Sequence, residues 1–228
     1  KRTSPEAVPS VVSNDPDALI HPSNALILAD LAQRHDRLWL ITDSSPFVPW
    51  ANRPVEQYLA RYFFPVNEVS GGDLARAVLF DLTAAPPPSA ATWPEQRLDA
   101  QFGAGLRLVG ADLPAGRAMA RGRNLPVSLL WEASGPIAQD YTVALLLIAP
   151  DGSVAAQRDS FPVNAFEPTS TWRAGSLHRD NHAIAISSGT PPGTYALWAV
   201  VYDWRTPDAR LPVTNADGEV SDHALLAE

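Results

Sequence analysis

The sequence contains no cysteine, and only one methionine, among its 228 residues. The lack of cysteine excludes disulfides, thiolate nucleophiles and thiolate metal ligands. Long apolar runs are also missing. The longest, 143–150 and 195–202, have the length of a buried strand, whereas a membrane helix needs roughly 20 residues. Basic residues number 17 against 25 acidic ones. The net charge of −8 gives no general attraction to a phosphate backbone, so no nucleic-acid partner is expected.

Proline is abundant, with 22 residues against 13 glycines, which favours short strands and turns over long helices. Residues 1–19 are polar and dotted with proline, and we expect them to be a tether in a chain cut from a longer one. A second stretch rich in proline and alanine, 84–100, is predicted to be a linker. It separates a small α/β segment, 20–83, from a domain at 101–228, which we expect to fold alone.

Hydrophobic periodicity gives the two parts different structures, so the predicted class is α+β overall. Residues 20–83 read as helix 25–34, strand 38–41, helix 55–64 and strand 77–82, a small βαβ-like unit. After residue 100 the chain reads as short strands and turns, with a two-residue hairpin at Asp151-Gly152 in which both residues would have positive φ. We predict an antiparallel β-sandwich, immunoglobulin-like or jelly-roll-like. Its expected strands are 106–113, 125–131, 141–149, 154–159, 177–186, 193–202, 210–213 and 220–226.

The order of the turn and strand motifs in this second part is distinctive. The motifs are FGAGLRLVG at 102–110, DYTV at 140–143, PDG at 150–152, PTSTWRAG at 168–175, PPGTY at 191–195, VYD at 201–203 and RLPV at 210–213. This series resembles the soluble C-terminal region of bacterial polytopic glycosyltransferases similar to dolichyl-phosphate-mannose protein mannosyltransferases. The resemblance implies an extracytoplasmic location at the bacterial cell membrane, attached through a transmembrane region that is missing here. It also implies that catalysis, with a polyprenyl-phosphate sugar donor, belongs to that membrane part, so no catalytic residue is carried over to this chain.

The sequence contains few signs of a catalytic or metal-binding site. No HExxH, GxSxG, GxGxxG or GxxxxGK[ST] pattern occurs, and neither a cofactor nor a metal site is predicted. His178 and His182 would lie about 13 Å apart on one strand face, too far to share a zinc ion. The carboxylates are scattered; a pair such as Asp180 with Asp203 is the arrangement that a glycosidase would need.

The tryptophans give the sharper hypothesis, because sugar rings stack on aromatic faces. Trp131 and Trp198 lie in apolar strands and are assigned to the core, whereas Trp172 and Trp204 lie near turns. For each of the latter two, ordinary packing is weighed against sugar stacking. The candidate ligand-binding residues are Trp172, Arg173, Trp204 and Arg205.

Three functions follow as hypotheses. The favoured one is a non-catalytic extracytoplasmic domain of a membrane glycosyltransferase-like protein, which covers the active face or binds the acceptor glycan or protein. Its partners would be the membrane-embedded remainder of the parent protein and that acceptor. The alternatives are a free-standing carbohydrate-binding or adhesion module, and a hydrolase with a site between the two halves.

Overall fold

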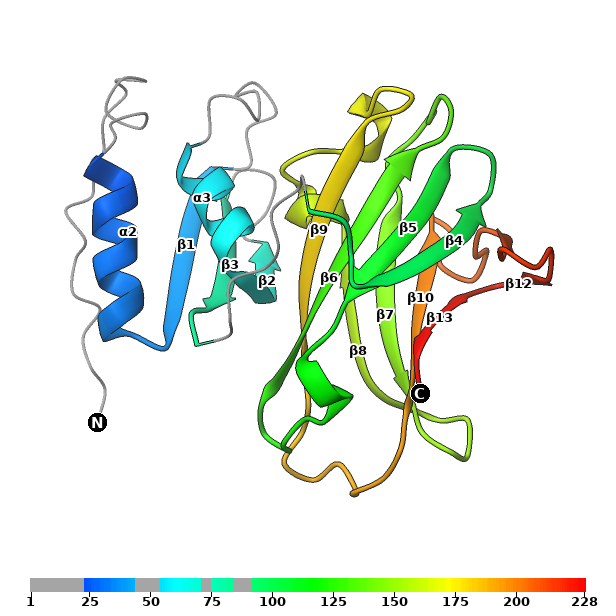
Figure 1. Ribbon diagram of the computed structural model, residues 1–228. Coiled ribbons are helices and arrows are strands. Elements are labelled where there is room, and N and C mark those ends of the chain that lie inside the picture. Colours follow the sequence, from blue (N-terminus) through cyan, green and yellow to red (C-terminus); the bar gives the residue numbers. More distant parts are fainter. Residues whose placement is uncertain (1–22, 44–53, 71–74, 84–91) are drawn as a thin grey trace.

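The computed structural model describes residues 23–43, 54–70, 75–83 and 92–228. The tether expected at 1–19 and the proline-rich stretch 84–91 lie outside these residues. The described chain forms a small three-stranded sheet with two helices, followed by a much larger pair of sheets (Figure 1).

The N-terminal sheet is antiparallel, with strand order β1-β3-β2. Its elements are α2 (Ser23–Arg34), β1 (Arg37–Asp43), α3 (Pro54–Tyr62), β2 (Phe64–Ser70) and β3 (Ala75–Asp81). The predicted helices and strands are all present, but the strand that follows α3 directly is β2, which the sequence analysis missed. β1 pairs antiparallel with β3 rather than parallel, so the predicted βαβ-like unit is not confirmed.

Among the described residues, helices cover one face of this sheet. Leu59 of α3 packs with Val78 and Phe80 of β3 in an apolar cluster that also receives Leu38 and Leu40 of β1. Because side chains alternate along a strand, the intervening residues of β1 point to the opposite face. There Trp39 is 50% exposed and Ile41 is 77% exposed.

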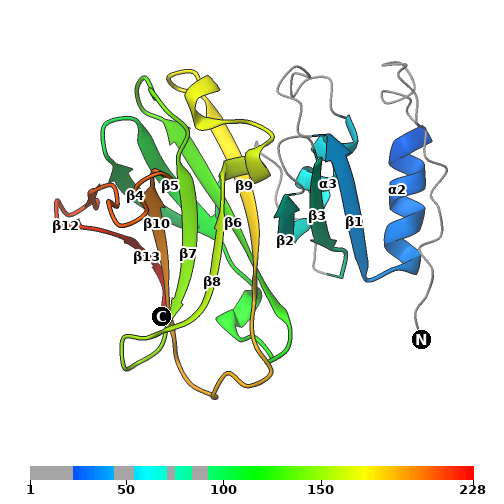
Figure 2. The ribbon, with the colours of Figure 1, turned by 180° about the vertical axis from the view of Figure 1, so that it is seen from behind.

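The remaining strands form two antiparallel sheets packed face to face (Figure 2). The larger has the order β12-β11-β4-β5-β6-β9 and the smaller the order β13-β10-β7-β8. The strands are β4 (Gln96–Phe102), β5 (Leu106–Asp112), β6 (Asn124–Ala133), β7 (Thr142–Ile148), β8 (Val154–Ser160), β9 (Leu177–Ala185), β10 (Ala196–Tyr202), β11 (Val213–Thr214), β12 (Val220–Ser221) and β13 (Ala224–Ala227). Short 3-10 turns lie between them at Ala115–Arg117, Pro162–Ala165 and Thr169–Thr171.

Alternate residues of both sheets meet in one apolar core, as a sandwich requires. Trp131 of β6 is 1% exposed, and its ring packs edge-on against Phe102 of β4 at a centroid distance of 5.3 Å. Leu145 of β7 and Val201 of β10 enter the same core from the smaller sheet. The β-sandwich and the core position of Trp131 are therefore confirmed.

The hairpin between β7 and β8 is present, but its turn differs from the predicted one. Only Gly152 has a positive φ, at 84°, and Asp151 does not. The amide of Gly152 donates to the carbonyl of Ala149, and the amide of Ala149 donates to the carbonyl of Ser153. This is a three-residue loop in which glycine alone needs the left-handed conformation, while the Asp151 carboxylate accepts from the Ser153 amide.

The sandwich begins before residue 101, because β4 starts within the range expected to be a linker. β4 lies between β5 and β11 in the larger sheet. Gly110 of β5 leaves room for this approach, since a Cβ there would clash with the carbonyl oxygen of Gln96. Residues 92–95 are also held: the amide of Glu95 donates to Asp112, and the guanidinium of Arg179 donates to the carbonyl of Thr92.

β2 of the small sheet lies beside β9 of the sandwich (Figures 1 and 2). Hydrogen bonds cross this junction: Asn181 donates to the carbonyl of Ala60 over 2.7 Å, and Asn124 donates to Asp81 over 2.6 Å. The guanidinium of Arg76 donates to the carbonyl of Asn164. It also lies over the ring of Phe166, 4.7 Å from the ring centre. The junction is thus held by polar groups as well as by packing.

Candidate functional site

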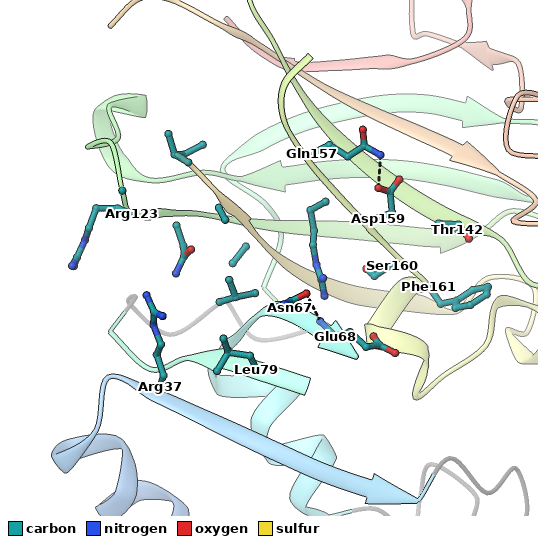
Figure 3. A pocket seen from close by; sticks show the side chains of 17 residues that line it. Arg37, Asn67, Glu68, Leu79, Arg123, Thr142, Gln157, Asp159, Ser160 and Phe161 are labelled. Atoms are coloured by element: carbon teal, nitrogen blue, oxygen red, sulfur yellow. Dashed lines mark hydrogen bonds between the residues drawn. The ribbon is translucent and has the colours of Figure 1, made fainter. Parts of the chain in front are cut away.

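A cavity lies at this junction, between one face of the small sheet and the edge of the sandwich (Figure 3). Its volume is about 780 Å³, within the range of small-molecule sites. Strands β1, β2 and β3 form one wall, and β8, β9 and the start of β6 form the other. The polar side chains that line this cleft include Arg37, Asn67, Arg123, Gln157, Arg158 and Ser160.

The position of Arg158 follows from the register of the smaller sheet. Arg158 of β8 pairs with Leu145 of β7, whose side chain enters the sandwich core. Residues directly opposite on antiparallel strands share a face, so Arg158 also points toward the space between the two sheets. β8 is the last strand of its sheet, and the arginine therefore emerges at the open edge of the sandwich, where it lines the cleft.

Arg158 is buried yet incompletely paired. Its side chain belongs to a residue that is 8% exposed, and its Nε and Nη2 atoms have no hydrogen-bond partner among the described residues. Burial lowers the pKa of this guanidinium below the ordinary value, against the opposing effects of Glu68 and Asp159. Each unsatisfied buried donor costs about 1–3 kcal/mol, so this arrangement is unfavourable for folding on its own.

Two further arginines meet at one end of the cleft. Arg37 comes from the small sheet and Arg123 from the sandwich, and in Figure 3 they approach the same space from opposite walls. Both are exposed, and within the described residues neither forms a salt bridge. Three arginines and two acids therefore line the cleft of a chain whose net charge is −8.

The two acids in the lining are already engaged. Glu68 forms a two-pronged ion pair with Arg76, with distances of 2.5 and 2.9 Å. Asp159 accepts hydrogen bonds from Gln157 and from the hydroxyl of Tyr202. Burial, together with Asp159, raises the pKa of Tyr202 to about 12, so this hydroxyl stays protonated and remains a donor.

An exposed aromatic ring lies on the face of the small sheet that contributes Arg37 and Leu79 to the cleft. Trp39 of β1 pairs directly with Leu79 of β3, and Leu79 lines the cleft. Trp39 also lies two residues from Arg37, which lines the cleft as well. Both relations place the indole on the cleft side of the small sheet, where half of it is accessible.

Behind the cleft wall, three side chains form a buried hydrogen-bonded series. Ser160, which lines the cleft, lies 3.2 Å from Nδ1 of His182, and Nε2 of His182 lies 2.7 Å from Asp180. The second carboxylate oxygen of Asp180 accepts the amide of Val163 over 2.8 Å, and Trp131 donates its indole N–H to the carboxylate over 3.2 Å. Asp180 is therefore not a solvated acid available for a glycosidase pair.

This series resembles a serine-nucleophile arrangement in composition but lacks an accessible base. A catalytic histidine takes the serine proton and then gives it to the leaving group, so both partners must reach it. His182 has no exposed surface, so a leaving group in the cleft cannot contact its ring. The geometry fits a structural network better than an active site.

What the network holds is an unusual turn. Val163, Asn164 and Ala165 have successive positive φ values of 51°, 54° and 60°. L-residues disfavour this conformation by about 1–2 kcal/mol each, and branched valine is especially rare in it. Asp180 secures the first of these residues and Arg76 secures the carbonyl of the second, which also ties the small sheet to the sandwich.

We expect Ser160 to be unreactive toward a serine-directed fluorophosphonate. Because His182 is inaccessible, the Ser160 hydroxyl lacks a general base that can both accept and release its proton. Intact mass spectrometry after incubation should therefore show no adduct. A stoichiometric adduct that disappears in Ser160→Ala would instead support the hydrolase alternative.

Of the predicted ligand-binding pair Trp172 and Arg173, only the arginine is exposed. Trp172 is only 5% exposed: its ring stacks on His178 at 3.9 Å, and its indole N–H donates to the carbonyl of Glu167. The expectation of an exposed ring at Trp172 is therefore wrong, and the packing interpretation is correct. Arg173 is exposed, but the ring next to it in the chain, Trp172, is buried.

The second pair has the predicted exposure. Trp204 is 55% exposed, and the guanidinium of Arg205 lies 5.0 Å from the centre of its ring. Asp203 holds Arg205 in place through the Arg205 amide and, at 3.4 Å, through the guanidinium. Asp203 is thus occupied locally and forms no hydrogen bond with Asp180 within the described residues.

No three histidine, aspartate or glutamate side chains among the described residues gather as around a metal ion. None of the helices in the described ranges is both long and apolar enough to cross a bilayer.

Comparison with known proteins gives no family. No family model matches the sequence, and no curated protein matches it. A calcium-binding mutant of Bacteroides uniformis beta-glucuronidase 2 is 10% identical over 64% of this chain and 19% of its own, with a TM-score of 0.31. A Bacteroides uniformis beta-glucuronidase is 12% identical over 68% and 19%, with a TM-score of 0.32. A putative beta-galactosidase from Bacteroides fragilis is 8% identical over 67% and 18%, with a TM-score of 0.24. This chain spans about a fifth of the length of these structures, and such low TM-scores do not bear on its fold or activity.

Proposed function

We propose that this chain is a non-catalytic extracytoplasmic domain of a membrane glycosyltransferase-like protein, and that it binds glycan in the cleft between the small sheet and the sandwich. The membrane assignment is supported by the resemblance of the motif series over residues 101–213. The inaccessible His182 behind the cleft supports a binding role rather than hydrolysis. A free-standing carbohydrate-binding module would use the same cleft, and hydrophobic spans upstream in the full-length gene would exclude it.

The observation that carries the glycan proposal is the exposed ring of Trp39 beside a polar cleft. Sugars present a C–H face, which stacks on an aromatic ring, and hydroxyl groups, which need donors and acceptors. Trp39 offers the ring. Asn67 and Gln157 line the cleft, and their side-chain amides offer both hydrogen-bond donors and acceptors. An apolar surface with a few convergent polar groups is the usual composition of a small-molecule site.

Replacing Trp39 by alanine is therefore expected to weaken oligosaccharide binding. By analogy with aromatic pairs, the stacked ring contributes about 0.5–1.5 kcal/mol beyond area burial, which corresponds to a roughly two- to tenfold loss of affinity. Binding is measured on an array of neutral and acidic oligosaccharides and then by titration calorimetry. The melting temperature should change little, because half of the ring is already in water.

Trp93→Ala is the matched control, since Trp93 is also 50% exposed. Trp39 lies next to lining residues, two positions from Arg37 and paired with Leu79, whereas no residue within two positions of Trp93 lines the cleft. Trp204→Ala tests the second surface, where a weak glycan contact by Trp204 and Arg205 remains a prediction. Loss of binding in Trp39→Ala alone supports the cleft. Loss in Trp204→Ala alone moves the site to the end of β10, and equal affinity in all three variants contradicts both sites.

A further inference from the structure

The cleft contains a positive charge that the described protein does not neutralise directly. The Nε and Nη2 atoms of buried Arg158 lack hydrogen-bond partners among the described residues, and those residues provide no carboxylate in ion-pair contact with it. The nearby acids are used elsewhere: Glu68 by Arg76, Asp159 by Tyr202, and Asp180 by three N–H donors. A guanidinium held in this way is prepared for an anion from outside.

The other charges in the cleft favour the same class of ligand. Arg37 and Arg123 stand on opposite walls at one end, both without salt bridges within the described residues (Figure 3). Guanidinium groups bind carboxylate and phosphate oxygens in a two-pronged geometry that hydroxyl groups cannot match. With Arg158 in the wall and two arginines at the end, the cleft can contact more than one anionic group along a bound chain.

From these observations we propose that the cleft selects anionic glycans, and that Arg158, assisted by Arg37 and Arg123, binds their carboxylate or phosphate groups. This inference rests on the proposed glycan-binding function and specifies its ligand class. Trp39 supplies the surface for the sugar ring, and the arginines distinguish a charged sugar from a neutral one of the same shape. Binding should weaken as salt is raised, mainly through the exposed Arg37 and Arg123.

The test compares matched sugars on the full 228-residue chain. Trigalacturonate is compared with its fully methyl-esterified form, which keeps the ring and removes the charge. Mannose 6-phosphate is compared with mannose, and inorganic phosphate is used alone as a competitor. We expect the charged member of at least one pair to bind more than tenfold tighter, and the pair that shows the preference identifies carboxylate or phosphate as the natural group.

Arg158→Met is expected to abolish this preference while stabilising the fold. Loss of a charge-assisted hydrogen bond should weaken binding of the charged sugar by roughly 10–100-fold. Replacing a buried, unpaired charge by an apolar side chain of similar length should raise the melting temperature by roughly 2–4 °C. A lower melting temperature with unchanged binding would show that Arg158 serves the fold, and the inference would be wrong.

Arg123→Gln keeps the test decisive even if Arg158→Met fails to fold, because Arg123 is exposed. It should weaken binding of the charged sugar about two- to fivefold, as expected for an exposed ion pair. Arg34→Gln replaces an exposed arginine of α2 that is outside the cleft lining, and it should leave binding unchanged.

The two proposals fail in different ways. Equal binding of charged and neutral sugars, lost in Trp39→Ala, would keep the glycan function and overturn the anion selectivity. Tight binding of inorganic phosphate without any effect of Trp39→Ala would keep the anion site and overturn the glycan function. An absence of binding to every probe would overturn both.

Discussion

Replacing Asp180 by alanine is expected to destabilise the protein by about 3–5 kcal/mol, the effect of removing one partner from a buried charged pair. Asp180 has no exposed surface and accepts N–H donors from Val163, Trp131 and His182. Alanine would leave all three donors buried without an acceptor. It would also release the turn at 163–165, whose positive φ values need external support.

The measurement is urea unfolding followed by tryptophan fluorescence, with Asp208→Ala as the matched control. Asp208 is an exposed aspartate, and its replacement should change the free energy of unfolding by less than about 0.5 kcal/mol. Asp180→Asn keeps one accepting oxygen and should lie between these two. If Asp180→Ala unfolds at the same urea concentration as the natural chain, the carboxylate does not hold the turn.

The sandwich could be predicted from the sequence because its strands are short, apolar on the buried face and separated by glycine and proline turns. The predicted ranges 154–159 and 177–186 differ from β8 and β9 by one residue at one end. The type of the turn between β7 and β8 was harder to predict than the strands. Asp151-Gly152 signalled a hairpin, but the count of loop residues, and so the number of positive φ angles, depends on the register between the two strands.

The two strands that the sequence did not predict were missed for different reasons. β2 contains Pro65 and the polar residues Asn67 and Glu68, and β4 contains Arg97 and Asp99. β2 therefore lacks the apolar alternation that marks a half-buried strand. β4 has it, in Leu98, Ala100 and Phe102, but most of the strand falls within the range that was assigned to the linker. β2 forms because β3 offers backbone hydrogen bonds along one of its edges, which is long-range information that no local pattern contains.

The candidate site was out of reach for a different reason. Its parts come from residues around 37, 67, 123 and 158, which only the docking of the small sheet onto the sandwich brings together. One local signal was present: Arg158 occupies a core-facing position of a strand, where an unpaired charge is unfavourable. Trp39 gave no such signal, since it lies in an apolar strand and is half exposed because α3 packs on the opposite face of the small sheet.

A fragment starting at residue 92 is expected to fold alone, whereas one starting at 101, the boundary predicted from the sequence, is not. β4 lies between β11 and β5, and the shorter fragment keeps only two of its seven residues. The longer fragment keeps the whole strand. It also keeps the carbonyl of Thr92 that receives Arg179 and the amide of Glu95 that donates to Asp112.

Comparing the unfolding of fragments 92–228 and 101–228 measures the contribution of β4 to stability. Comparing fragment 92–228 with the full chain measures the contribution of the small sheet. Fragment 92–228 should unfold cooperatively, because its apolar core is complete and it loses mainly polar contacts such as that of Asn181 with Ala60. Fragment 101–228 should show no cooperative transition, since β5 and β11 would each lose a partner strand and Phe102 would lie at a frayed end. Cooperative unfolding of both fragments would show that β4 is dispensable. If 92–228 is unfolded while the full chain is folded, the small sheet is part of the sandwich's folding unit, and the junction that forms the cleft is required for the fold itself.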